Sequence, residues 1–389
     1  MNKTVVLISA LLLSITSAFF SYSYFAPTSR ISIISPSADY AAPVQDGSGE
    51  VTEFEGPRTE ACPLNGELLT KQHRSLWETR RPMGVMIENH IEARPQSGLQ
   101  SADVIYEMVA EGGITRFLSV FYCKDASYVG PIRSARVYFV KQMQAFGEYP
   151  LYVHVGGANT PGPADALGLL SKLEWASYND LNQFSISFPT FYRDYARLKD
   201  VATEHTMYSS TAKLWTYAKD KRKLTNKDAS GVSWDSTFKP WSFADSVAET
   251  ANTKPATSIS YGFWAGRGDY GVSWKYDPAG KVFLRDNGGK AHVDHNTDKQ
   301  LRARNVIAMY VKESPANDGY PGGHLVYNVV GSGIATIFQE GQAIDATWRK
   351  AKETEMVRFF DKKGTEISML RGNIWISIIP QGSNELTYQ

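Results

Sequence analysis

The chain of 389 residues has almost no excess of charge of either sign. Lys and Arg number 41 and Asp and Glu number 40, which leaves a net charge of +1. Nucleic-acid-binding proteins usually carry a basic excess, so this balance argues against a nucleic-acid partner. The sequence also lacks G-x-S-x-G, H-E-x-x-H, P-loop and dinucleotide-binding motifs, and its S-x-x-K match at Ser210–Lys213 lacks the partner motifs. We therefore assign no catalytic residue and no cofactor.

The sequence also contains few cysteines, since Cys62 and Cys123 are the only two. Outside the cytoplasm, two cysteines can form one disulfide. A bridge between Cys62 and Cys123 would pin an N-terminal segment to the core of the first domain. The alternative is two separate buried thiols.

The N-terminus carries the longest apolar run. Lys3 precedes Val5–Phe20, and the run continues with small polar breaks to Ala26. This length can span a bilayer, so residues 1–26 are predicted to be a signal peptide or a membrane anchor. Residues 27–60 are rich in Ser, Ala, Pro, Gly and Asp and predict a flexible linker. We expect the cell membrane with the bulk of the chain on the extracytoplasmic side, or secretion if the segment is cleaved.

A β-hairpin is the clearest local prediction. Val104–Ala110 is an apolar run of strand length, Gly112-Gly113 follows, and Ile114–Tyr122 is rich in β-branched and aromatic residues. Alternation places Arg116 on a largely apolar strand face. A charge there needs a partner, and Glu107 and Glu111 are the nearest carboxylates.

A helix is predicted over Ala135–Phe146, with Ser134 as its N-cap. Arg136 would then fall in the first turn and Arg133 just before it. Cations are unfavourable at a helix N-terminus, so two arginines there suggest a bound anion. The alternative is that they pair with Glu88, Glu107 or Glu111 and only stabilise the domain.

His154 lies in a predicted strand, Leu151–Val155, next to Gly156-Gly157, where the backbone can approach a ligand closely. The predicted ligand-binding residues are therefore Glu88, Arg94, Glu107, Glu111, Arg116, Arg133, Ser134, Arg136 and His154. His292, Asp294 and His295 are not assigned as metal ligands, because on a strand His295 would point away from the other two. No metal site is predicted.

The predicted fold class is α+β. Residues 61–243 predict a mixed α/β N-terminal domain. A polar stretch, Ala244–Lys254, follows, and residues 255–385 contain regularly spaced short strands without a clear long helix. This pattern predicts a C-terminal domain that is all-β, sandwich or barrel-like.

The chain resembles the YerB-like family of bacterial envelope proteins, often lipoproteins, whose function is not established. The matching stretches are RPMGVMIEN, ARPQSGLQSADVIYE, EGGITRFLSVF, GPIRSAR, YVHVGG, NVIAMYV, GSGIATIFQEGQAIDATWRK and GNIWISIIP. The resemblance covers roughly Cys62–Pro380 and implies two successive domains but no catalytic residue. In the loop Glu204–Tyr208, His205 and Tyr208 match the family pattern, whereas Glu204 and Thr206 do not. No ligand role is assigned to this loop.

Two functions follow from these observations. The preferred one is an extracytoplasmic, membrane-tethered protein that binds an anionic small molecule or a peptidoglycan-like polymer through its Arg and Glu residues. The alternative is a hydrolase or transferase that acts on cell-envelope polymers, with a pair among Glu88, Glu107 and Glu111 as acid and base.

Overall fold

The computed structural model describes residues 54–248, 253–383 and 386–389. The predicted signal or anchor segment, residues 1–26, and most of the predicted linker, residues 27–60, lie outside these ranges. In the part of the chain that is described, no helix is both long and apolar enough to cross a bilayer. Short helices and many strands make up the structure, so the fold class is α+β, as the sequence predicted.

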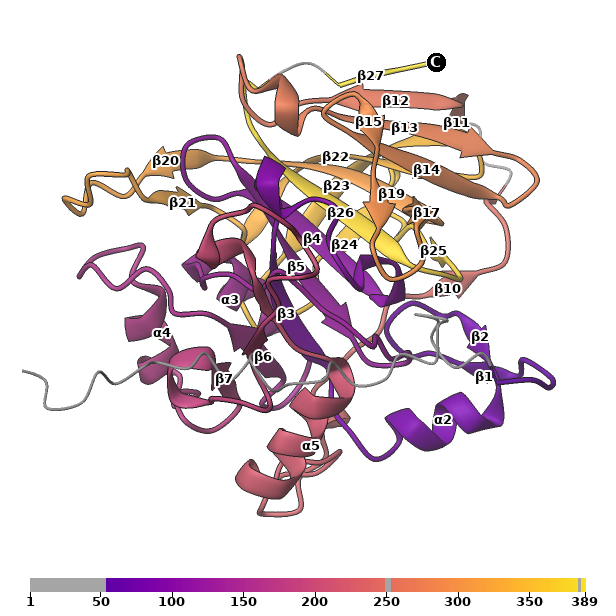
Figure 1. Cartoon of the computed structure of the whole chain (residues 1–389). Helices are drawn as coiled ribbons and strands as arrows, with labels where there is room; N and C mark the ends of the chain where they lie inside the picture. The colour runs from indigo at the N-terminus through magenta and orange to yellow at the C-terminus, as the bar shows by residue number, and fades with distance from the viewer. Residues whose placement is uncertain (1–53, 249–252, 384–385) are drawn as a thin grey trace, which may run out of the picture. The chain divides into compact units, whose positions relative to one another are not determined.

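One eleven-stranded sheet organises the fold (Figure 1). Its strands follow one another in the order β11 (Thr253–Pro255), β23 (Gln342–Lys350), β22 (Gly331–Gln339), β19 (Asn305–Val311), β26 (Ile374–Pro380), β4 (Val104–Val109), β5 (Thr115–Phe121), β3 (Met83–Glu88), β6 (Leu151–His154) and β7 (Asp180–Asn182), and β24 (Arg358–Phe360) also pairs with β23. Strands β4 and β5 form the predicted hairpin, with Val104 opposite Val120 and Val109 opposite Thr115. The hairpin prediction is confirmed.

The sheet is continuous between the two halves of the sequence. Strand β26 runs parallel to both β19 and β4, with Ile374 opposite Asn305 on one side and Val104 on the other. Every residue of β26 is buried, which suits an apolar strand in the middle of a sheet. The predicted boundary at Ala244–Lys254 therefore separates two sequence ranges that share one sheet.

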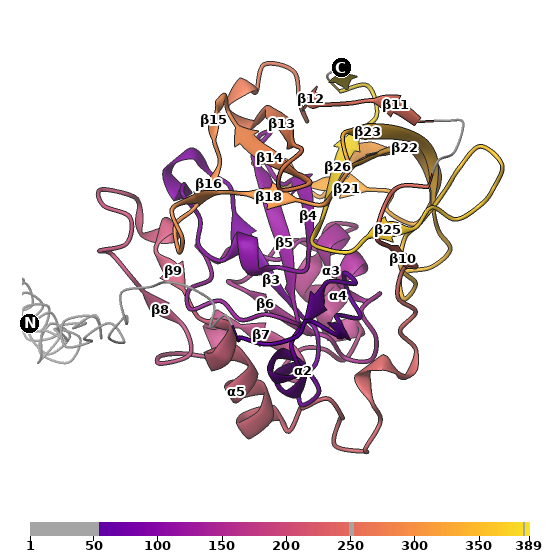
Figure 2. The ribbon, with the colours of Figure 1, turned by 90° about the vertical axis from the view of Figure 1, so that its right-hand side faces the viewer.

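A second sheet has six strands and lies at the top of Figures 1 and 2, with α5 at the bottom. Its strands are β15 (Lys290–Ala291), β14 (Val282–Asn287), β13 (Val272–Asp277), β12 (Ser258–Tyr261) and β27 (Thr387–Tyr388), with β18 (Arg302–Ala303) beside β14. The remaining strands form pairs: β1 (Glu60–Ala61) with β2 (Leu68–Leu69), β8 (Tyr192–Arg193) with β9 (Met207–Tyr208), β10 (Phe243–Ala244) with β25 (Met369–Leu370), β16 (Val293–Asp294) with β17 (Lys299–Gln300), and β20 (Glu313–Pro315) with β21 (Leu325–Tyr327).

Different layers cover the two faces of the large sheet. In the described residues the α-helices are α2 (Lys71–Trp77), α3 (Val137–Met143), α4 (Ala166–Lys172) and α5 (Thr211–Arg222). On one face α3 packs so closely over Gly84 that a Cβ atom there would lie 2.5 Å from the sulfur of Met143. On the other face the six-stranded sheet packs through Trp274, whose ring lies edge-on to that of Trp375 at 5.4 Å.

Candidate functional site

Polar residues collect where β3 and β6 end. These strands run parallel, with Met83 opposite Leu151, and their last residues are Glu88 and His154. Arg116, near the start of β5, lies directly opposite Glu88. The carboxyl ends of parallel strands meet at one edge of a sheet, which is a common position for ligand sites in open sheets. The sheet topology therefore brings predicted site residues from separate strands together.

Glu88 links an arginine and a histidine. Its Oε1 lies 3.0 Å from Nε of Arg133, and its Oε2 lies 2.8 Å from Nδ1 of His205. The side chains of Glu88 and His205 are almost fully buried, at 4% and 5% exposure, whereas that of Arg133 is 27% exposed. Arg133 therefore joins this buried pair to the solvent.

Glu111 holds two further arginines. Its two oxygens accept hydrogen bonds from Nε and Nη2 of Arg136, the second at 2.6 Å. Nη2 of Arg116 lies 3.9 Å from the same carboxylate, and Nη1 donates to the carbonyl of Ser134 at 2.8 Å. Burial acts to raise the pKa of Glu111, but the hydrogen bonds and charge of Arg136 hold it below its usual value. Glu111 is therefore a carboxylate anion whose two oxygens are both bound by Arg136.

Arg116 is the most deeply placed cation of this group. Burial first, and then the charge of Arg136, lower its pKa to about 10, and Glu111 opposes the shift. Arg116 stays charged at neutral pH with one backbone hydrogen bond and one long ion pair.

We refer to Glu88, Glu111, Arg116, Arg133, Arg136 and His205 as the Arg/Glu/His cluster.

The predicted helix start is wrong. Helix α3 begins at Val137, and its N-cap is Arg136 without a side-chain capping bond. Residues 133–135 are extended instead, because Val155 N–H donates to the Arg133 carbonyl and Ala135 N–H donates to the Gly156 carbonyl. Ser134 contributes its carbonyl to Arg116 rather than a cap to the helix. The arginines are therefore placed by strand-like pairing and by glutamates, not by a helix N-terminus.

His154 is fully buried beside the cluster. Its Nδ1 lies 2.6 Å from the Gly156 carbonyl and its Nε2 lies 2.5 Å from Oδ1 of Asp180. Both partners are hydrogen-bond acceptors. Burial keeps His154 from direct contact with solvent.

Glu107 does not join the other glutamates, contrary to the prediction that groups them. It lies opposite Phe117, whereas Glu88 lies opposite Arg116, so alternation puts Glu107 on the other face of the sheet. There both its oxygens accept from Nη2 of Arg285, at 3.0 and 2.9 Å, and one accepts from the indole of Trp375. This ion pair is 0% exposed on both sides.

Arg94 also lies apart from the cluster. Its Nε donates to Oδ1 of Asn89 at 3.0 Å, and its Nη1 donates to the carbonyl of Asp269 at 2.9 Å. The guanidinium lies 5.1 Å from the ring centre of Tyr270. Arg94 therefore connects the segment after β3 to a turn before β13.

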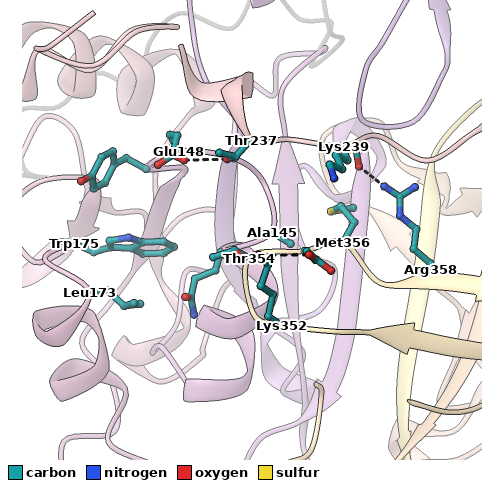
Figure 3. Close-up of a pocket in the computed structure, with 14 residues that line it drawn as sticks. Ala145, Glu148, Leu173, Trp175, Thr237, Lys239, Lys352, Thr354, Met356 and Arg358 are labelled. Carbon is teal, nitrogen blue, oxygen red and sulfur yellow. Dashed lines mark hydrogen bonds and ion pairs between the residues drawn. The ribbon is translucent and has the colours of Figure 1, made fainter. Parts of the chain in front are cut away.

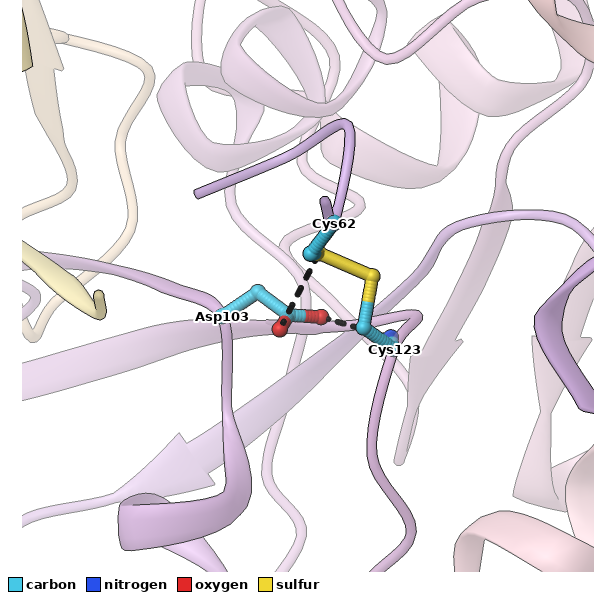
Figure 4. Close-up of side chains that lie close together, drawn as sticks. All are labelled: Cys62, Asp103 and Cys123. Atoms are coloured by element: carbon cyan, nitrogen blue, oxygen red, sulfur yellow. Dashed lines mark hydrogen bonds between the residues drawn. A yellow bond between two sulfur atoms is a disulfide. The ribbon is translucent and has the colours of Figure 1, made fainter. Parts of the chain in front are cut away.

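Cys62 and Cys123 form a buried disulfide (Figure 4). Beneath it, Oδ2 of Asp103 accepts hydrogen bonds from the amides of Tyr122 and Cys123, and Oδ1 accepts one from Asn65. Oδ1 of Asp103 also lies 3.7 Å from the Cys62 sulfur, which carries no hydrogen, so this is a contact only. Burial raises the pKa of Asp103 to about 6. The bridge excludes these cysteines as metal ligands.

A cavity of about 580 Å³ lies elsewhere (Figure 3). Trp175 and Leu173 line it on one side, and Lys352, Met356 and Arg358 line it on the other. No residue of the Arg/Glu/His cluster lines this cavity. It lies between segments of the two sequence halves and has both aromatic and charged walls.

Comparisons with known proteins identify the family. Two family models match, the N-terminal domain of a protein of unknown function (DUF3048) over residues 67–225 and the C-terminal domain of the same family over residues 260–376. The chain belongs to the DUF3048 family. The Bacillus subtilis (strain 168) protein named "Putative lipoprotein YerB" is 28% identical over 327 residues, which cover 82% of this chain and 86% of that protein. The crystal structure of the YerB protein from Bacillus subtilis matches with a TM-score of 0.66 at 25% identity, over 84% of this chain and 99% of that chain. The predicted resemblance to YerB is confirmed.

The two DUF3048 matches divide the polar groups between them. The whole Arg/Glu/His cluster, from Glu88 to His205, falls in the N-terminal DUF3048 match. Arg285 and Trp375, which hold Glu107 on the opposite face, fall in the C-terminal match. The C-terminal match thus supplies strands of the same sheet and the partners of Glu107 on its opposite face, whereas the N-terminal match carries the cluster.

Sequence reasoning missed four residues of this region: Asp180, His205, and two neighbours of His205, namely Glu92 at 3.4 Å from its Nε2 and His90, whose ring stacks on it. The loop of His205 was set aside because Glu204 and Thr206 depart from the family pattern, although His205 itself matches it. The match of His205 to the family pattern could have identified it as a site residue. No sequence pattern could have identified Asp180, because its contact with His154 depends on the pairing of β6 with β7.

Proposed function

We propose that this protein is a membrane-tethered envelope protein that binds an anionic ligand at the Arg/Glu/His cluster. The observation that carries the proposal is the charge balance of the cluster. Among the arginines and glutamates of the cluster, Arg116, Arg133 and Arg136 supply three positive charges, whereas Glu88 and Glu111 supply two negative charges. The carboxylates of Glu92 and Glu204 at its rim are exposed. Buried charges are costly unless paired, so one further anion would complete the group.

Arg133 offers the means to hold that anion. Its Nε faces Glu88, and among the described residues its two terminal nitrogens make no hydrogen bond. A guanidinium with free terminal N–H groups suits a carboxylate or phosphate oxygen. The 27% exposure of this side chain leaves it accessible from solvent.

An exposed aromatic ring lies near the same edge. Phe184 is 77% exposed, and its ring lies so close to Gly156 that a Cβ atom there would be 2.8 Å from it. Gly156 in turn accepts a hydrogen bond from Ala135, in the segment that carries Arg133. An aromatic face beside cations suits an acidic sugar, which supports a cell-wall fragment as the ligand class.

The location rests on two supports. The relative from Bacillus subtilis carries the name of a lipoprotein, and residues 1–26 of this chain have the pattern of a signal or anchor. Residues 27–60 would tether the folded part outside the cytoplasm. A protein in this position meets acidic envelope polymers and their fragments.

The paired-carboxylate enzyme has less support. Glu88 and Glu107 lie on opposite faces of the sheet, and Glu111 is held by two bonds from Arg136. Glycosidases need two carboxyl groups that flank the same bond. Glu107 therefore cannot flank one bond together with Glu88, and Glu111 is occupied by Arg136.

A thermal-shift titration tests the proposal. Sulfate and phosphate should raise the melting temperature of the full-length protein in a saturable manner, with chelator present throughout. Arg133→Gln should abolish the response, and its melting temperature without anion should fall, because the buried Glu88 keeps only His205 as a partner. Arg302→Gln, at an exposed arginine of β18, serves as the matched control and should respond like the wild type. A wild type whose melting temperature ignores both anions, or an Arg133→Gln variant that responds fully, would contradict the proposal.

A further inference from the structure

Two histidines and a glutamate meet at the rim of the cluster. His90 and Glu92 lie around the short 3-10 turn Ile91–Ala93 that follows β3, and His205 ends the 3-10 turn Thr203–His205. One ligand atom from each of the three residues lies within 4.8 Å of the others. None of the three belongs to the predicted ligand-binding set.

The spacing of one pair already matches a metal site. Nε2 of His205 lies 3.4 Å from Oε2 of Glu92. Zinc bonds to His and Glu are about 2.0–2.2 Å long, so the edge of a tetrahedron built on them is about 3.3–3.5 Å. One ion can therefore bridge these two atoms without a shift of the backbone.

Glu88 orients His205 for this role. Its buried carboxylate lies 2.8 Å from Nδ1 of His205 and is itself held by Arg133. When Nδ1–H donates to a carboxylate, the lone pair of Nε2 is free to bind a metal, and such carboxylate–histidine pairs are usual around protein-bound zinc. The buried half of the site is thus already arranged.

His90 is the adjustable ligand. Its ring stacks on that of His205, with centroids 4.8 Å apart and planes at 8°, and its Nδ1 accepts a 3.3 Å hydrogen bond from the Glu92 amide. In-plane lone pairs of parallel rings do not converge, so His90 must turn to share an ion with His205. Its partial exposure gives it room to do so, and water can replace the lost hydrogen bond.

We propose that His90, Glu92 and His205 bind a divalent transition-metal ion, with zinc as the favoured metal. Two imidazoles and one carboxylate suit zinc better than calcium or magnesium, which prefer all-oxygen ligands. Three protein ligands leave a fourth position for water or an anion. The site shares His205 and its partner Glu88 with the Arg/Glu/His cluster, but it does not require anion binding by Arg133.

Metal binding is measured directly on full-length protein, purified without a polyhistidine tag and stripped with chelator. Calorimetric titration should give one Zn²⁺ per chain, and Co²⁺ should give the visible absorption bands of a four-coordinate site. His90→Ala and Glu92→Gln should each weaken Zn²⁺ binding by at least about tenfold. Glu88→Gln should weaken it by about 10–100-fold, because Glu88 orients a ligand without touching the ion.

Glu204→Gln is the matched control for Glu92→Gln. Glu204 is also exposed and adjoins His205, but it is not one of the three ligands, so its removal should leave affinity and the Co²⁺ spectrum unchanged. Absence of stoichiometric Zn²⁺ binding overturns the proposal, as does binding that survives both His90→Ala and Glu92→Gln. Because the anion titration contains chelator, the failure of one proposal does not imply failure of the other.

Discussion

The ion pair between Glu107 and Arg285 should contribute strongly to the stability of the folded protein, because it connects the N-terminal and C-terminal halves of the sequence. Arg285 belongs to β14 and Glu107 to β4, and both side chains are 0% exposed. The Arg285 guanidinium also lies 4.4 Å from the ring centre of Trp375 in β26. Replacement of Arg285 by Met keeps a similar side-chain volume. It leaves the charge of Glu107 buried, with two neutral hydrogen-bond donors, the Trp375 indole and the Thr115 hydroxyl.

Breaking a buried pair on one side typically costs about 3–5 kcal/mol, so we expect Arg285→Met to lower the free energy of unfolding by that amount. Urea denaturation of full-length protein, followed by tryptophan fluorescence and far-UV circular dichroism, measures it. Arg302→Met, at an exposed arginine, should change stability by less than about 0.5 kcal/mol.

A double-mutant cycle separates the free-energy cost of leaving one buried charge unpaired from the net contribution of the ion pair to stability. Glu107→Leu combined with Arg285→Met removes both charges, so its cost should be well below the sum of the two single changes. Since β26 joins β19 to β4, both optical probes should also report one shared transition. Additive single costs, or two transitions of which Arg285→Met shifts only one, would refute this reasoning.

Three further outcomes follow from the structure. The Cys62–Cys123 bridge spans 61 residues, so Cys62→Ala with Cys123→Ala should cost about 4 kcal/mol on the chain-entropy model, and denatured, unreduced wild type should label with no thiol reagent. Burial lowers the pKa of Lys350 from 10.5 to about 7. Between these pH values the unfolded chain binds more protons than the folded chain, so the free energy of unfolding should rise with pH. Lys350→Met should remove this rise in melting experiments. Cell fractionation should place the full-length protein in membranes, released by detergent, and full-length protein found soluble in the cytoplasm would contradict the tether.

Short-range patterns were sufficient where the deciding contacts are local. The alternation of Val104–Ala110 and Ile114–Tyr122 around Gly112-Gly113 predicts the hairpin of β4 and β5, because a strand pair with a short turn is stabilised by residues close in the chain. The motifs shared with YerB likewise predict the family from the sequence alone. The helix after Ser134 was predicted but starts later, because Arg116 and the segment 155–157 compete for its first backbone groups.

Tertiary structure decided which charges meet. Glu107 and Glu111 are close in sequence, yet pairing in the sheet sends Glu107 to the opposite face, where Arg285 from the other half of the chain holds it. The contact of Glu88 with His205 joins residues 117 positions apart, and β26 joins β4 from the far end of the chain. Composition and spacing determined that the chain carries an Arg- and Glu-rich unit within an α+β fold. The partners of each charge depended on strand order and register, because these long-range pairings leave no periodic signal in the sequence.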